Sequence, residues 1–194
     1  MNLNFEKDIV LENDRVLLRP LQVADTSHLI PVTLHDEKLI QYSPAQIHTK
    51  ELLTKYIEGA VSDRQNKKRY PFIIFDKKVN AYAGSTSFLD VSNKDKRIEI
   101  GATWLGRQFQ KTGLNRNCKF LLLSYVFDTL KFERLQFITD ERNQASRTAI
   151  EKIGGKFEGT LRSHTLMTDG FRRNTVVYSI LKNEWLALKK NFIQ

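Results

Sequence analysis

The sequence contains one cysteine, two methionines, four prolines and no long apolar run among its 194 residues. A single cysteine, Cys118, cannot form an internal disulfide, and its apolar surroundings predict a buried thiol. No stretch approaches the roughly 20 consecutive apolar residues that a membrane-crossing helix needs. The N-terminus lacks the basic-then-apolar order of a secretory signal peptide, so we expect an intracellular, cytoplasmic protein without a membrane partner.

The length and composition, with 41% hydrophobic and 27% charged residues, are typical of one globular domain spanning residues 1–194. The formal charge of +9 favours an anionic partner, such as nucleic acid, an acidic protein surface or a phosphorylated cofactor. Short basic clusters at 67–69 and 172–173 lack interleaved aromatics, which favours a solvated basic face over a nucleic-acid site. The four histidines show no metal-ligand spacing, so no metal site is predicted.

Alternating and helical patterns along the chain predict a single α+β domain. A long apolar helix connects two strand-like runs, which implies a crossover and a parallel relation between the flanking strands. The other strands follow one another through short turns, so we expect a central mixed, mostly antiparallel sheet of about seven strands flanked by helices. The expected strands are 15–19, 70–75, 81–91, 97–105, 134–139, 157–166 and 175–181. The first expected helix begins at Asp25, its N-cap candidate, and the others cover 49–61 (with Thr49 as the cap), 114–130 and 143–153, before a short tail.

A glycine-containing loop, Arg107-Gln-Phe-Gln-Lys-Thr-Gly-Leu-Asn115, joins the strand at 97–105 to the long helix. The first-turn amides of a helix lack intrahelical partners and lie at the positive end of its dipole. Gly113 permits close approach of a phosphate, and Lys111 and Arg107 add positive charge. For this loop alone, a strand-to-helix turn that needs glycine for its geometry is the simpler alternative.

The order of strand, Gln110-Lys-Thr-Gly-Leu-Asn115, helix and strand, followed by Asn143-x-x-Ser146 and Ile153-Gly154, resembles the GNAT superfamily of acetyl-CoA-dependent N-acetyltransferases. The loop follows that superfamily's pattern Gln/Arg-x-x-Gly-x-Gly/Ala, except that Asn115 replaces the last small residue. Within the superfamily the chain is most similar, over residues 113–185, to the ribosomal-protein N-terminal acetyltransferases.

The resemblance implies a three-layer GNAT-like fold and acetyl-CoA as the co-substrate. It assigns the pyrophosphate to the loop amides and the pantetheine arm to backbone groups at the end of the preceding strand, where a parted strand leaves its ladder groups unpaired. It also assigns to Asn143 a contact with the pantetheine arm, although helix capping suits asparagine equally well. The cofactor-binding residues implied in this way are Trp104, Leu105, Gln110, Lys111, Thr112, Gly113, Leu114, Asn115 and Asn143.

Glu99 is the candidate general base, because it lies inside an otherwise apolar strand where an ionised side chain requires a partner or a function. The two-residue period places Ile98, Ile100 and Trp104 on one face of that strand and Glu99 on the other. A carboxylate can remove a proton from an amine substrate through a water molecule. A salt bridge to Arg97 or a solvent-facing position explains Glu99 equally well, and both interpretations stay open.

Ser146 lies three residues after Asn143, and the resemblance implies that it protonates the leaving thiolate. An ordinary exposed helix serine is the alternative interpretation. Tyr178, in the strand expected at 175–181, is a weaker candidate for this role and is expected in the core.

The expected reaction is acetyl transfer from acetyl-CoA to a protein N-terminal amine, by direct attack in a ternary complex. A small amine, such as a polyamine, amino sugar or antibiotic, is the nearest alternative acceptor, but acidic residues do not cluster over 39–69 as a polycation would require. A non-catalytic acyl-CoA-sensing or nucleic-acid-binding module is the alternative from another class. Against it stands the joint presence of Glu99, Gly113, Asn143 and Ser146. A monomer and a homodimer both remain open.

Overall fold

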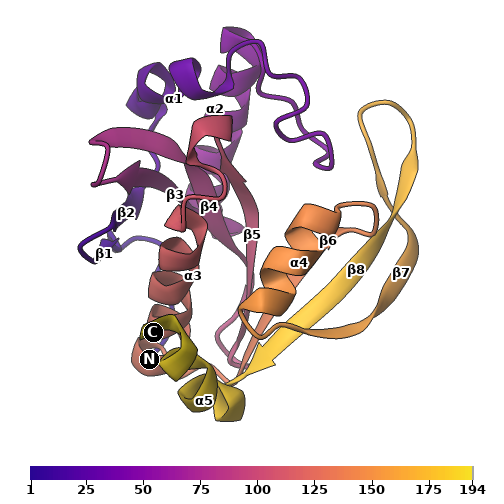
Figure 1. Cartoon of the computed structure of the whole chain (residues 1–194). Helices are drawn as coiled ribbons and strands as arrows, with labels where there is room; N and C mark the ends of the chain where they lie inside the picture. Colours follow the sequence, from indigo (N-terminus) through magenta and orange to yellow (C-terminus); the bar gives the residue numbers. More distant parts are fainter. Residues whose placement is uncertain (194) are drawn as a thin grey trace.

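Eight strands form one mixed sheet in this computed structural model, which describes residues 1–193 (Figure 1). The strands are β1 Leu11–Glu12, β2 Val16–Pro20, β3 Arg69–Asp76, β4 Ala81–Ser92, β5 Arg97–Leu105, β6 Arg134–Asp140, β7 Lys156–Leu166 and β8 Arg172–Leu181. They are ordered β1-β2-β3-β4-β5-β6-β8-β7, and every neighbouring pair is antiparallel except β5 and β6. The expected α+β fold with a mixed, mostly antiparallel sheet is therefore confirmed.

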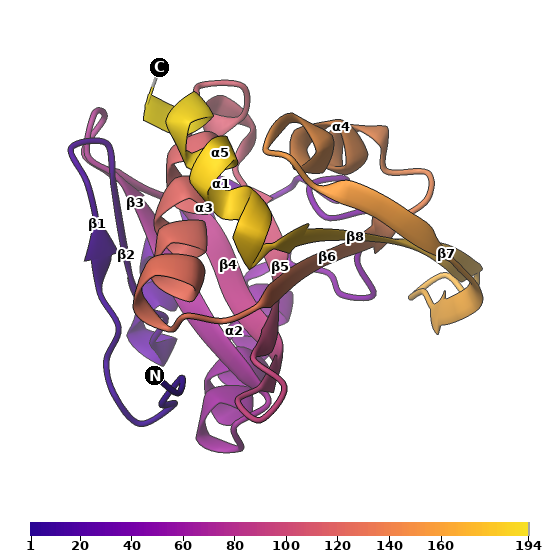
Figure 2. The same cartoon turned by 90° about the horizontal axis from the view of Figure 1, so that it is seen from below.

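Helices cover both faces of this sheet, which gives three layers (Figure 2). α3, α4 and α5 lie on one face, whereas α2 lies on the other and packs against α1. The helices are α1 Thr26–Thr33, α2 Lys50–Gln65, α3 Leu114–Ser124, α4 Gln144–Lys152 and α5 Lys182–Ile193, with 3-10 turns η1 Val23–Asp25 and η2 Arg107–Phe109 and a π-type turn η3 Tyr125–Thr129.

The larger apolar core lies between α3 and the sheet. Leu114, Cys118 and Leu122 recur every four residues, so they share one face of α3 and are fully buried. They belong to the same cluster as Ile98 and Ile100 of β5. The predicted burial of the Cys118 thiol is thereby confirmed.

Trp104 departs from the two-residue alternation expected for β5. It belongs to the smaller core on the α2 side, together with Leu53. The register between β4 and β5 shifts just before Trp104, and Ala102 adopts a positive φ of 47°. Because such a β-bulge inserts one extra residue, the side chains after it turn to the other face. The expectation that Trp104 shares a face with Ile98 and Ile100 is therefore wrong.

The C-terminal segment forms helix α5, where the sequence suggested only a short tail. Trp185 is 4% exposed, packs on Phe127 and donates from Nε1 to Asp128 at 3.0 Å. These tertiary contacts stabilise a helix that local propensity alone leaves marginal. The segment expected to be helical at 114–130 is helical, but its last turn is π-type, because the amide of Leu130 bonds the carbonyl of Tyr125.

The two helix caps expected in the N-terminal third have different outcomes. Thr49 Oγ1 accepts the amide of Leu52 at 3.2 Å, which confirms the cap of α2. Asp25 precedes α1 as expected, but its carboxylate binds Arg19 at 2.6 Å and the amide of Gln22 at 2.9 Å. Asp25 therefore does not cap α1 with its side chain, since the buried arginine contact uses both of its oxygens.

Candidate active site

β5 and β6 part after a short parallel ladder. The ladder joins residues 97–99 of β5 to residues 134–136 of β6. Both strands continue beyond it, to Leu105 and Asp140 respectively, and Figure 1 shows them diverging. Backbone groups along a parted strand can bond an extended ligand in place of the missing strand.

The N-terminus of α3 follows directly from the parted end of β5. Gly113 precedes the helix with a φ of 85°, a left-handed conformation that favours glycine. A Cβ placed on Gly113 would meet no atom within 4 Å, so the space in front of the helix is open. The first-turn amides of α3 lack intrahelical partners and lie beside this space. The arrangement fits a phosphate group.

The loop residues before Gly113 mostly hold the loop in place. Gln110 donates from Nε2 to the carbonyl of Leu105 at 2.9 Å and from its backbone amide to Arg107 at 3.2 Å. Arg107 forms an ion pair with Asp36 at 2.7 Å instead of facing the open space without a partner. Lys111 is exposed and has a positive φ of 60°. Of these three polar side chains, Lys111 is the one left to meet an anion.

Thr112, Leu114 and Asn115, at the start of α3, each make a different kind of contact. Thr112 Oγ1 donates to the carbonyl of Phe109 at 2.8 Å, and the side chain of Leu114 is fully buried in the α3-side core. Asn115 Oδ1 is buried and has no hydrogen-bond partner among residues 1–193. A buried acceptor without a partner calls for a donor from a ligand or a water molecule. A phosphate has no donor to offer, so this oxygen fits a bound water molecule rather than the phosphate itself.

Glu99 is 6% exposed and lies at the last paired position before the strands part. Its Oε2 accepts from Gln136 Nε2 at 3.2 Å, whereas Arg97 pairs with Asp90. Neither alternative from the sequence, a salt bridge to Arg97 or a solvent-facing position, describes this carboxylate. The pKa of Glu99 is raised to about 7, mainly by burial and to a smaller extent by the charge of Asp90, while the Gln136 hydrogen bond and the charge of Arg173 act to lower it. Such a group can exchange protons near neutral pH.

Asn143 and Ser146 lie at the N-terminus of α4. Asn143 Oδ1 accepts the amide of Ser146 at 3.1 Å, so the capping role is present. Within residues 1–193, neither Asn143 Nδ2 nor the Ser146 hydroxyl forms a hydrogen bond. Tyr178 is fully buried, donates to Glu151 at 2.9 Å and accepts from Arg147 at 3.1 Å, which confirms its expected place in the core.

Lys119 is a buried cation that the sequence analysis missed. It is 6% exposed, and its Nζ donates to Thr103 Oγ1 at 2.7 Å. Thr103 Oγ1 in turn lies 2.7 Å from Thr86 Oγ1. Burial lowers the pKa of Lys119 to about 8. The signal was present in the helical period, because Lys119 follows buried Cys118 and precedes buried Leu122 by three residues.

Two arginines tie the loop between α1 and α2 to the C-terminal half of the sheet. Arg173 of β8 is 8% exposed and donates to the carbonyl of Tyr42 at 2.6 Å. Arg142 pairs with Asp140 at 2.6 Å, and its guanidinium lies 5.9 Å from the ring centroid of Tyr42 in that loop and 4.1 Å from that of Phe171. These contacts form a rim on the Glu99 side of the parting, since the charge of Arg173 acts on that carboxylate.

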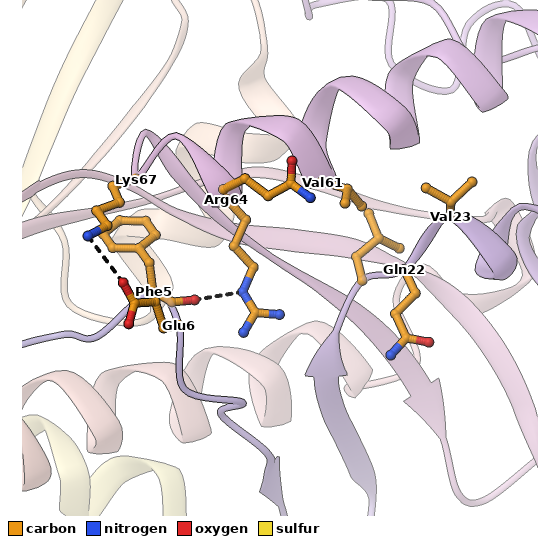
Figure 3. A pocket seen from close by; sticks show the side chains of 9 residues that line it. Phe5, Glu6, Gln22, Val23, Val61, Arg64 and Lys67 are labelled. Atoms are coloured by element: carbon orange, nitrogen blue, oxygen red, sulfur yellow. Dashed lines mark hydrogen bonds and ion pairs between the residues drawn. The ribbon is translucent and has the colours of Figure 1, made fainter.

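A surface hollow lies apart from this region, between the N-terminal segment and α2 (Figure 3). Arg64 Nε donates there to the carbonyl of Phe5 at 2.9 Å, and Lys67 pairs with Glu6 at 3.3 Å. None of the expected site residues lines this hollow. The parting of β5 and β6 therefore remains the candidate active site.

Within 1–193, no group of three or more His, Cys, Asp or Glu side chains is arranged to hold a metal ion. Over the same range, every helix is too short or too polar to cross a bilayer.

Comparisons with known protein families, sequences and structures all match this chain to acetyltransferases. A family model described as an acetyltransferase (GNAT) domain matches residues 15–156. The Bacillus subtilis (strain 168) protein named uncharacterized N-acetyltransferase YoaA is 25% identical over 173 residues, which cover 89% of this chain and 97% of that protein. From the same organism, YdaF, provisionally named a ribosomal N-acetyltransferase, is 30% identical over 102 residues, 53% of this chain and 55% of that protein. The crystal structure of a GCN5-related N-acetyltransferase from Brucella melitensis matches with a TM-score of 0.89 at 26% identity, over 96% of this chain and 85% of that one.

Proposed function

Since this chain belongs to the GNAT family of acetyltransferases, we propose that it moves the acetyl group of acetyl-CoA to the N-terminal amine of a protein. The observation that carries the proposal is the parting of β5 and β6. The open N-terminus of α3 lies beside it, and buried Glu99 lies at the last paired position before the strands separate. The reaction needs a held thioester, an uncharged amine and a proton for the leaving thiolate.

The proposed cofactor contacts come mainly from the backbone. Amides of Gly113, Leu114 and Asn115 would hold the pyrophosphate, and Lys111 would add its charge. The β6-facing edge of β5 up to Trp104 and Leu105 would bond the pantetheine arm. Gln110 and Thr112 would act indirectly, because their side chains hold the loop against β5 and η2. Acetyl-CoA supplies the activated acetyl thioester when bound.

Glu99 is the proposed general base. Its raised pKa lets the carboxylate accept a proton from the acceptor ammonium near neutral pH, directly or through a water molecule. Asn143 is proposed to contact the pantetheine arm through Nδ2, while Oδ1 continues to cap α4. The two roles of Asn143 are compatible because they use different atoms of its side chain.

A protein N-terminus suits the acceptor side better than a polyamine. Acidic side chains at the rim already have partners: Asp140 pairs with Arg142, and Asp36 pairs with Arg107. A polycationic acceptor would need unpaired carboxylates, whereas one N-terminal ammonium needs only Glu99. The partial match to YdaF, provisionally named a ribosomal N-acetyltransferase, also favours a peptide. We place this reaction in the cytoplasm, where protein N-termini and acetyl-CoA meet.

Calorimetric titration with acetyl-CoA tests the cofactor site. We expect the wild type to bind, and Gly113→Glu to weaken binding by at least about 100-fold, because the new carboxylate repels the pyrophosphate. Gly170→Glu is the matched control, since Gly170 has a similar φ of 82° and equally open surroundings at the β7–β8 turn. Wild-type protein that binds no acetyl-CoA, or equal losses in both variants, contradicts the proposal.

Release of free CoA thiol in the presence of candidate acceptors tests the substrate class. We expect turnover with peptides that carry a free N-terminus and none with the same peptides after N-terminal acetylation. Polyamines, amino sugars and aminoglycosides form the comparison set. Faster turnover with any of these small amines would replace the peptide by a small-molecule acceptor and leave the cofactor site unchanged.

A further inference from the structure

Lys119 is buried without a countercharge. Among residues 1–193, no acidic side chain pairs with it, and its Nζ makes one hydrogen bond, to Thr103 Oγ1 at 2.7 Å. An ammonium has three donors, so two of them lack a partner in this range. Leaving a charged group buried in this way is costly. The cost points to a ligand that completes the bonding of Lys119.

The ammonium lies at the parting of β5 and β6, on the α3 side of the sheet. Thr103 follows the bulge in β5, and its hydroxyl is held by Thr86 of β4. Nζ also lies 5.9 Å from the ring centroid of Phe137, the β6 residue directly after the last paired position, Gln136. Lys119 therefore contacts the stretch of β5 that the proposed function assigns to the pantetheine arm.

Glu99 lies on the opposite side of the same parting. Its neighbours Ile98 and Ile100 face the α3-side core, so strand alternation turns Glu99 towards the rim that contains Arg173. A buried acid thus lies on the acceptor side and a buried cation on the cofactor side. Acid–base catalysis needs two groups that exchange protons near neutral pH on either side of the reacting bond.

We propose that Lys119 is the general acid that protonates the leaving CoA thiolate, an inference that rests on the proposed acetyl transfer. When the acceptor nitrogen bonds the thioester carbonyl carbon, the carbon–sulfur bond breaks and its electron pair passes to sulfur. Lys119 donates one Nζ proton to that sulfur, which yields the CoA thiol and a neutral lysine amine. The acceptor nitrogen loses its proton to Glu99 or to water bound there, and solvent restores the ammonium.

Lys119 suits this role better than Ser146, which the sequence resemblance suggested. A serine hydroxyl is a far weaker acid than an ammonium, and Ser146 makes no side-chain hydrogen bond to β5 within residues 1–193. Lys119 is bonded directly to that strand. It also carries the positive charge that stabilises a developing thiolate.

Lys119 and Glu99 have different titratable neighbours, so the pH effects of these two side chains can be told apart. Cys118 lies beside Lys119, but burial raises the pKa of its thiol to about 12, so it stays neutral over the working range. Asp90 and Arg173 are the charged groups that act on Glu99. The acid limb of the pH–rate profile therefore belongs to Glu99, and the alkaline limb belongs to Lys119.

The first test needs no acceptor. CoA bound to the wild type is titrated with pH, and the ultraviolet absorbance of the thiolate reports the pKa of the bound thiol, with the acetyl-CoA complex as the blank. A neighbouring ammonium lowers such a pKa by about 1–3 units. We expect Lys119→Met to raise the thiol pKa by this amount. The exposed-lysine control Lys55→Met, on α2, and the Ser146→Ala variant should both match the wild type.

Each outcome of this titration has a distinct meaning. Equal thiol pKa values in the wild type and Lys119→Met overturn this inference alone. Wild-type protein that binds no CoA overturns the proposed function and this inference together. A depressed thiol pKa that is lost in Ser146→Ala and kept in Lys119→Met transfers the role to Ser146. Lys119→Gln provides the same comparison if Lys119→Met fails to bind CoA.

The second test separates charge from proton transfer. With an N-terminal peptide as acceptor, Lys119→Met should lower kcat by about 100-fold and remove the alkaline limb near pH 8. Lys119→Arg keeps the positive charge but holds its proton too tightly, so it should retain the depressed thiol pKa without restoring kcat. Full activity in either variant contradicts the assignment of Lys119 as the acid.

Discussion

Where β5 and β6 part, each face of the sheet has one buried ionisable side chain: an acid, Glu99, on one face and a base, Lys119, on the other. On the α2 side, Glu99 is surrounded by polar groups: it accepts from Gln136 and is influenced by Asp90 and Arg173. On the α3 side, Lys119 is embedded in the larger apolar core and has one hydroxyl partner within residues 1–193.

This difference shows how one fold can shift two pKa values towards neutrality by the same physical cause. Burial disfavours the charged form, so it raises the pKa of Glu99 and lowers that of Lys119. Polar neighbours also change the pKa of Glu99, whereas the pKa of Lys119 depends almost entirely on burial. Variants at these two positions should therefore respond differently in activity, stability and pH dependence.

The largest expected effect is on activity, from Glu99→Gln. The amide cannot accept a proton, so we expect kcat with an acceptor peptide to fall by about 100-fold to 1,000-fold, with the affinity for acetyl-CoA changed by less than about 2-fold. The wild-type rate should rise with pH through about 7, the pKa of Glu99, and the variant should lack this rise. Glu58→Gln, at an exposed position on α2, is the matched control. A variant as active as the wild type would assign the base elsewhere.

An intermediate effect is expected on stability, from Lys119→Met. Replacing an unpaired buried cation by an apolar side chain of similar length should raise the free energy of unfolding at pH 7 by about 1–3 kcal/mol. The folded-state pKa of about 8 lies below the ordinary value of 10.5, so the unfolded chain binds more protons between these pH values. Wild-type stability should therefore rise with pH across this window.

Urea denaturation at pH 7 and above pH 10 measures this effect. The advantage of Lys119→Met should shrink at the higher pH, and Lys55→Met should follow the wild type at both. A destabilised Lys119→Met protein would contradict this prediction and show that the bond of the ammonium to Thr103 outweighs the cost of its burial.

The smallest expected effects come from the neighbours of Glu99. Gln136→Leu removes a hydrogen bond that lowers the pKa of Glu99, so the acid limb of the pH–rate profile should move to higher pH by less than about 1 unit. Asp90→Asn removes a negative charge that raises this pKa, so the limb should move to lower pH. Shifts of the same sign in both variants would contradict the assignment of this limb to Glu99.

The repeating patterns of the chain made most of the secondary structure predictable. Helical spacing located α2 and α3, and the turn signals separated the strands that form the antiparallel part of the sheet. The predictions failed where contacts between residues far apart in the sequence override the local sequence pattern. The bulge at Ala102 turned Trp104 to the other face, and packing against Phe127 made a helix around Trp185.

The candidate site was predictable where a residue's function depends on its backbone. Gly113 has the positive φ that its place before a helix suggested. The position of Glu99 within an apolar strand also suggested a special role, but its partner did not follow from the sequence. Gln136 is 37 residues away and becomes a neighbour only through the parallel pairing of β5 and β6.

By itself, the sequence determined the α+β class, the parallel crossover and the glycine loop at the start of α3, because periodicity and backbone freedom are local properties. The tertiary structure alone decided which charged side chains are deprived of water. Solvation depends on everything that packs around a group, and for Lys119 and Glu99 these surroundings come from strands and helices far apart in the chain.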